Sequence, residues 1–131
     1  MAYVDPSALT PAISGDLPEE TRIRLERFPI LMSSTLLDAE LRAAFQDEQQ
    51  TYSPSLDSVI NQWVLPNRRL DEELAAVSEI VSLPALPLWH LASAMYFQQR
   101  QSLTSRQYRL AFITLDEQQE TAARELGFFI P

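Results

Sequence analysis

The sequence predicts an all-α protein, a small helical bundle of four to six helices with extended terminal arms, and three observations support this prediction. The chain has 131 residues, of which 46% are apolar, enough for one domain with its own core. It contains only two glycines, whereas sandwiches and barrels need glycine in many tight turns. Apolar residues also recur at i, i+3, i+4 and i+7 in several segments, as on the buried face of a helix.

The two glycines set the expected boundaries within this single domain, residues 1–131. Residues 1–15 form an N-terminal arm that ends at Gly15, residues 16–126 form the bundle, and residues 127–131 form a C-terminal tail. Gly127 follows the last helical segment, at the position where a left-handed residue commonly ends a helix.

Capping residues mark the expected helix starts. A polar N-cap followed by proline or acidic residues favours a first turn, because it satisfies a backbone N–H and suits the helix dipole. Helix starts of this kind occur at Asp5, Asp16, Ser53 and Asp71, and Thr104 with Gln107 matches a capping box. The helix that begins at this capping box is the last one, and it is expected to run to about Leu126.

Three apolar stripes predict the buried helix faces. The first lies on an expected helix from Pro29 to Gln46, the second on a helix that starts at Ser53, and the third on the central helix. We expect the second and third stripes to share one core, because short loops favour antiparallel neighbours. The stripes are Leu37, Leu41, Ala44 and Phe45; Leu56, Val59, Ile60 and Trp63; and Leu88, Leu91, Ala92 and Met95.

The composition excludes several classes of function. The formal net charge is −8 and all ten basic residues are arginine, so lysine chemistry and a polybasic membrane patch are excluded. No cysteine is present, which excludes disulfides and thiol catalysis. The N-terminus lacks the features of a signal peptide and no segment is apolar enough to span a membrane, so we expect a cytoplasmic protein.

No set of residues predicts a catalytic, cofactor-binding or metal site. His90 is the only histidine, and an ordinary hydrogen bond in the core or at the surface is its expected role. The carboxylates of residues 71–73 and 116–120 are expected in helix first turns or on solvated faces. Trp63 and Trp89 lie within helical apolar patterns and are expected to pack in the core. We therefore predict that the protein is not an enzyme.

The C-terminal tail is the predicted partner-binding site. A chain end is usually polar, whereas this one carries large apolar side chains. Leaving each of them exposed would forgo a burial free energy of about 1.5–3 kcal/mol. They can fold back on their own domain or dock into another subunit. The residues are Phe128, Phe129, Ile130 and Pro131.

Three segments resemble the head–tail connector (adaptor or neck) proteins of tailed phages. The first, from Asp57 to Pro66, reads Asp-Ser-Val-Ile-Asn-Gln-Trp-Val-Leu-Pro. The second runs from Leu86 to Tyr96 and contains an apolar helix with small residues and a terminal tyrosine. The third is Tyr108-Arg109-Leu110-Ala111, followed by an extended tail. The resemblance covers roughly residues 56–131.

This resemblance implies a structural virion protein of the neck region, assembled in the host cytoplasm. Its subunits would form an oligomeric ring, commonly a dodecamer, beneath the portal protein and above tail or neck proteins. DNA would pass through the lumen, and an acidic lumen would let it slide because like charges repel. The implied partners are therefore other copies of the chain, the portal and the tail.

Two other functions remain open from the residues. The chain can be a helical interaction or regulatory module that binds a single partner. It can also be a small enzyme that uses its carboxylates, which is the least favoured of the three.

The charge yields a first prediction. We expect no specific binding to duplex DNA at ~150 mM salt, because phosphate contacts depend on basic residues and this chain is strongly acidic. A filter-binding assay checks this, and sub-micromolar affinity at that salt would refute it.

Overall fold

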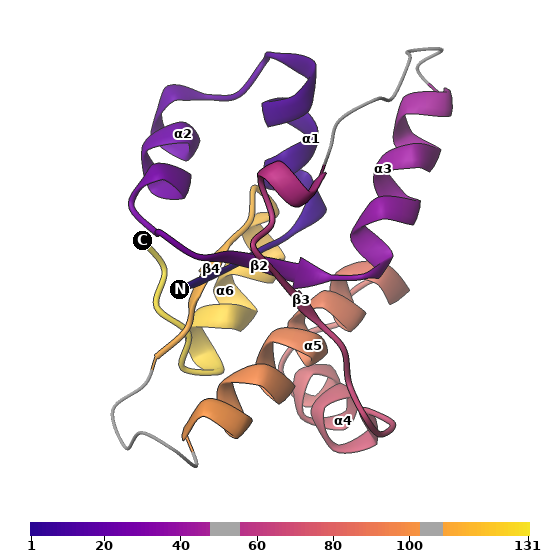
Figure 1. The fold of residues 1–131 in the computed structure, drawn as a ribbon. Helices are drawn as coiled ribbons and strands as arrows, with labels where there is room; N and C mark the ends of the chain where they lie inside the picture. The colour runs from indigo at the N-terminus through magenta and orange to yellow at the C-terminus, as the bar shows by residue number, and fades with distance from the viewer. Residues whose placement is uncertain (48–55, 103–108) are drawn as a thin grey trace.

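The computed structural model describes residues 1–47, 56–102 and 109–131, and it shows an α/β protein, so the all-α prediction is wrong. Within these ranges, six α-helices surround a four-stranded parallel sheet (Figure 1). The strand order is β3-β2-β1-β4, and all three pairings are parallel.

The elements alternate along the chain between strands and helices. The strands are β1 (Ala2–Val4), β2 (Leu31–Ser34), β3 (Gln62–Val64) and β4 (Ala111–Ile113). The helices are α1 (Pro6–Ser14), α2 (Glu19–Glu26), α3 (Leu36–Asp47), α4 (Asp71–Ile80), α5 (Ala85–Ser102) and α6 (Glu117–Glu125). A short 3₁₀ turn, Leu56–Ser58, precedes β3.

The expected N-terminal arm is in fact the centre of the sheet. Strand β1 lies between β2 and β4, with Tyr3 opposite Met32 on one side and opposite Phe112 on the other. A strand in this position is covered on both faces, so it is apolar throughout and does not alternate with polar residues. Ala2, Tyr3 and Val4 are accordingly all fully buried.

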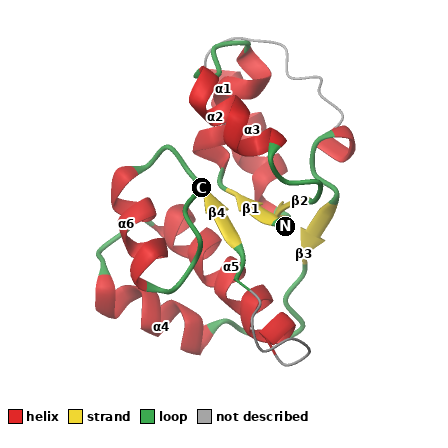
Figure 2. Cartoon of the chain, turned by 90° about the vertical axis from the view of Figure 1, so that its left-hand side faces the viewer, coloured by secondary structure: helices red, strands yellow, loops and turns green. Residues whose placement is uncertain are grey.

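Helices cover both faces of the sheet. In Figure 2, α1, α2 and α3 lie above the strands, while α4, α5 and α6 lie below and beside them. Successive side chains of a strand point to opposite faces, which gives each strand a place in two separate cores. The core beside α1–α3 includes Ala2, Val4, Leu9, Leu37, Leu41, Ala111 and Ile113. The core beside α4–α6 includes Tyr3, Met32, Val77, Leu91, Phe112, Ala122 and Phe128.

The two cores overturn the expectation of one shared core for the second and third stripes. Leu56, Ile60 and Trp63 belong to the α1–α3 side, whereas Leu91 belongs to the α4–α6 side. The sheet separates them, because a parallel sheet needs a helical layer on each face. Trp63 itself is half-buried.

Three expected helices are replaced in part by strands. The helix predicted from Pro29 begins only at Leu36, because the preceding residues form β2. The helix predicted from Ser53 is replaced, within the described residues, by the 3₁₀ turn and β3. The last predicted helix is divided into β4 and α6. Ser53, Thr104 and Gln107 themselves lie outside the described residues.

Several local predictions are confirmed. Asp5 caps α1 by accepting a hydrogen bond from the Ser7 N–H at 3.0 Å, and Pro6 is the first helical residue. Gly15 and Gly127 both adopt positive φ angles, 85° and 88°, after α1 and α6. These features depend on neighbouring residues only, which is why the sequence sufficed to predict them.

The C-terminal tail folds back on its own domain. The Phe128 side chain is buried, with its ring centroid 5.6 Å from that of Phe112. Phe129 extends the sheet beyond β4: its N–H donates to the Leu110 carbonyl at 3.0 Å, and its carbonyl accepts from the Phe112 N–H at 2.9 Å. The Phe129 side chain is 43% exposed. The tail is therefore an edge of the sheet with one residue in the core.

No single helix within the described ranges is long and apolar enough to cross a membrane. Helices α4 and α5 meet that criterion only when taken together, and they are bent by 116° relative to one another.

The burial of Phe128 predicts the effect of removing the tail. Deletion of residues 128–131 should lower the free energy of unfolding by about 3–5 kcal/mol, because it removes a core aromatic side chain. Urea denaturation followed by circular dichroism measures this loss. Phe129→Ala is the control and should cost less than about 1 kcal/mol, since that side chain is partly exposed. A truncated chain as stable as the wild type would contradict the placement of Phe128.

Candidate functional site at the carboxyl ends of the strands

The strand order identifies where a ligand would be expected. The chain leaves β1 towards β2 on one side, while β4 pairs on the other side, so the sheet has a switch point between β1 and β4. In open α/β sheets, ligands bind outside the carboxyl ends of the strands at such a point. Asp5 follows β1 and Thr114 follows β4 directly, so these two side chains flank the switch point.

A network of hydrogen bonds fills this position. The Asp5 carboxylate accepts from the Gln119 amide at 2.8 Å with Oδ1 and from the Ser7 hydroxyl at 2.7 Å with Oδ2. The Thr114 hydroxyl donates to Gln119 Oε1 at 2.6 Å. Gln119 Nε2 also donates to the Pro87 carbonyl at 3.1 Å, which connects α6 to α5. Gln119 is fully buried and Asp5 is 5% exposed.

The network leaves little unmet polar capacity at the switch point. Gln119 uses its amide nitrogen for two bonds and its oxygen for a third. The Thr114 hydroxyl also accepts from the Asp116 N–H at 3.0 Å, and Asp116 caps α6 by accepting from the Gln119 N–H at 3.0 Å. Buried polar groups are stable only when paired in this way, so the side chain of Gln119 joins the carboxyl ends of β1 and β4.

A second network joins β1, β2, α3 and α5 across the sheet. The Tyr3 hydroxyl lies 2.8 Å from Nδ1 of His90, and His90 Nε2 lies 2.5 Å from the Glu40 carboxylate. The Tyr3 oxygen also accepts from the Ser34 N–H at 3.0 Å, and Trp89 Nε1 donates to Ser34 Oγ at 3.1 Å. The network therefore begins at the most central strand and ends at a half-buried carboxylate.

The bonds of Tyr3 are compatible with a His90 tautomer that leaves Nδ1 as an acceptor. The Tyr3 oxygen accepts from the Ser34 N–H, so its own hydrogen is available for Nδ1 of His90. A neutral His90 then carries its hydrogen on Nε2 and donates it to Glu40. Burial raises the pKa of Tyr3 far above its usual range, which keeps the hydroxyl protonated as this arrangement requires.

Neither ring nitrogen of His90 is free for chemistry. The residue is fully buried and both nitrogens are already paired, so a substrate atom cannot reach the ring without displacing Tyr3 or Glu40. His90 thus lies in the core with hydrogen-bonded nitrogens. Trp89, on the neighbouring face of α5, anchors the end of β2 through its indole N–H.

The carboxylates of residues 71–73 and 116–120 were expected in helix first turns or on solvated faces. One of them, Glu73, is in a first turn but is buried. Glu73 is fully buried in the first turn of α4, where Arg68 binds it with two hydrogen bonds of 2.5 and 3.0 Å. The Arg68 guanidinium holds the pKa of Glu73 below its usual range. Asp116 and Glu117 do lie at the start of α6. Within the described ranges, no three His, Asp or Glu side chains are arranged to hold a metal ion.

Sequence reasoning did not find this pair of networks. Asp5 was assigned only as a helix cap, and Tyr3, Glu40 and Gln119 were not singled out. The signal that could have found them is the pair of short apolar runs, Ala2–Val4 and Ala111–Ile113, each followed by a polar residue. In parallel sheets such polar residues gather at one edge. The tail that the sequence predicted to bind a partner lies apart from this edge, and Phe129 is its one large hydrophobic side chain that is exposed.

The fold and the site together define a doubly wound α/β protein, with a parallel sheet between two helical layers and a hydrogen-bonded side-chain network at its switch point. Compared with protein-family models, curated proteins and solved structures, the chain matches none.

The Tyr3 hydroxyl yields a prediction on alkaline stability. Its pKa is higher in the folded than in the unfolded protein, so its stabilising effect is complete below about pH 10 and is lost as the pH rises further. The wild type should lose about 1.4 kcal/mol of stability per pH unit above this point from Tyr3 alone. Urea denaturation between about pH 9 and about pH 11 measures the slope.

Tyr3→Phe should be less stable than the wild type at neutral pH by about 1–3 kcal/mol, because the Ser34 N–H and His90 lose their partner. Its stability should then fall less steeply with alkaline pH. Tyr96→Phe is the control. It should not make the loss of stability at alkaline pH less steep, because hydrogen bonds from Asn67 and Arg100 lower the pKa of Tyr96. Equal slopes for the wild type and Tyr3→Phe would contradict the assignment.

Proposed function

We propose that this protein acts by binding another protein and carries out no reaction of its own. The observation that supports this proposal most directly is the hydrogen-bonded network at the switch point. Gln119 is buried between Asp5, Thr114 and the Pro87 carbonyl, where a doubly wound sheet would otherwise hold a small ligand. The fold then offers its outer helical surfaces for recognition.

The surface properties favour a basic protein partner. The net charge is −8, and complementary charge steers association and selects among partners. Several large apolar side chains are also exposed, among them Ile80, Leu86 and Leu65. Apolar anchors surrounded by charge are typical of protein interfaces. This proposal retains the interaction module considered from the sequence, with an α/β fold in place of the helical one.

A head–tail connector ring is a more specific form of the same proposal. Its support is the resemblance of residues 57–66, 86–96 and 108–111, together with an acidity that suits a lumen for DNA. The helical bundle that the resemblance implied is replaced by the parallel sheet, and residues 62–64 form β3. In this form the partners would be other copies of the chain, the portal and the tail, in the neck of a virion. Mixing the chain with a portal ring and inspecting the product by electron microscopy tests it.

Two experiments distinguish the general proposal from the alternative that the protein is an enzyme that uses its carboxylates. The purified chain is incubated with labelled single-stranded RNA and with phosphate esters in Mg²⁺ or Mn²⁺, next to Asp5→Asn and Asp116→Asn variants. We expect no turnover that depends on Asp5 or Asp116. Native mass spectrometry of the tagged chain isolated from its own cells should show a complex heavier than 14.9 kDa.

The opposite result has a clear meaning. Hydrolysis that is lost in both variants, with their folds intact, would make the carboxyl edge an active site and refute the proposal. Recovery of the chain only as a free monomer would also count against it.

A further inference from the structure

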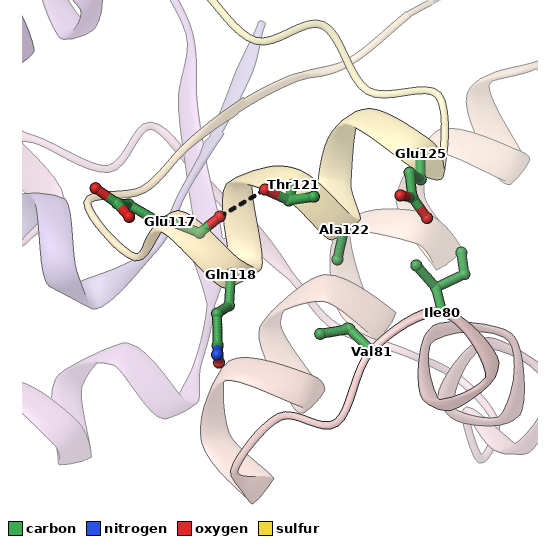
Figure 3. Close-up of a pocket in the computed structure, with 7 residues that line it drawn as sticks. All are labelled: Ile80, Val81, Glu117, Gln118, Thr121, Ala122 and Glu125. Carbon is green, nitrogen blue, oxygen red and sulfur yellow. Dashed lines mark hydrogen bonds between the residues drawn. The ribbon is translucent and has the colours of Figure 1, made fainter.

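A groove of about 310 Å³ lies between the end of α4 and the outer face of α6 (Figure 3). Ile80 and Val81, at the end of α4, lie opposite Ala122 of α6 and form its apolar floor. Glu117 and Glu125 lie at the two ends of the α6 side, as the close-up shows. The Ile80 side chain is 38% exposed, so the floor is accessible.

The groove carries two carboxylates that no basic side chain in the described part of the chain pairs with. The carboxylates of Glu117 and Glu125 make no hydrogen bond or ion pair with another described residue. The basic residue in the last turn of α6, Arg124, pairs with Glu120 at 3.0 Å. Helix α4 ends at Ile80 with no basic residue in its last turn, so the negative end of its dipole also points to this region.

We propose that this groove binds a basic amphipathic helix of a partner protein, an inference that rests on the proposed function. Glu117 and Glu125 are eight residues apart on α6, which is about 12 Å along a helix axis. A partner helix that lies alongside α6 matches them with two arginines eight residues apart. An apolar residue midway between these arginines then faces Val81 and Ala122, and the aliphatic part of the arginine opposite Glu125 packs on Ile80.

The groove is a poor fit for a second copy of this chain. Among the described helices, none carries two arginines seven or eight residues apart. The arginines of α2 are already paired, Arg22 with Glu19 and Glu26 and Arg24 with Glu20. The occupant we infer is therefore a different protein, with two arginines at a helical spacing that the described helices of this chain lack.

A model peptide tests the inference with the full chain. The probe is a fluorescent alanine-rich helical peptide that contains Arg-x-x-x-Leu-x-x-x-Arg, and fluorescence anisotropy measures its affinity. Glu117→Gln combined with Glu125→Gln should weaken binding at least about tenfold, and Ile80→Ser should do the same. Asp16→Asn combined with Asp47→Asn changes the net charge equally at exposed positions elsewhere, and should change the affinity less than about twofold.

Circular dichroism and thermal unfolding confirm that each variant is folded. Equal weakening by the groove and control variants would reveal non-specific attraction and overturn the inference. If the peptide does not bind, the inference about the groove is overturned. The proposed function would still be supported if native mass spectrometry shows the chain in a complex with another protein. Sedimentation of the chain alone as a dimer that Ile80→Ser disrupts would assign the groove to a second copy instead.

Discussion

The rest of the structure depends on the position of Tyr3 at the centre of the sheet. Its backbone pairs with β2 and β4, its ring stacks on Phe112 with centroids 5.5 Å apart, and its hydroxyl connects Ser34 and His90. One residue thus joins both neighbouring strands and reaches α5. A buried hydroxyl must find partners, so the positions of β2 and α5 are constrained together.

The same constraint also fixes the polar side chains at the carboxyl ends of β1 and β4. Asp5 directly follows β1, so the strand that holds Tyr3 also fixes the carboxylate at the switch point. Asp5 then binds Gln119 from α6 and Ser7 from α1, one element from each helical layer. These bonds hold the layers to the sheet at the edge where ligands usually enter. The fold thereby gains a fixed centre at its carboxyl edge.

The helices of the α4–α6 layer differ in how far they are covered. The middle of helix α5 is packed against the sheet, with His90, Leu91, Ala92, Ser93 and Ala94 all buried. Helices α4 and α6 lie outside it and contact each other, and Ile80 at the end of α4 lines the groove between them. Ile80 lies at the Glu125 end of the groove, where an exposed apolar side chain and an acidic side chain are close to each other.

The sequence by itself determined the features that depend on near neighbours: the Asp5 cap, the start of α1 at Pro6, the left-handed Gly15 and Gly127, and the buried stripe of α3. It also placed Trp89 and His90 on one apolar helix. It did not reveal the strands, because runs of three or four residues buried on both faces show no period of two. Only the tertiary structure decided that residues 2–4 pair with residues 111–113 and that Phe128 enters the core, since those contacts join distant parts of the chain. The candidate site could not be predicted without the strands, because Asp5, Thr114 and Gln119 meet only when β1 and β4 lie side by side.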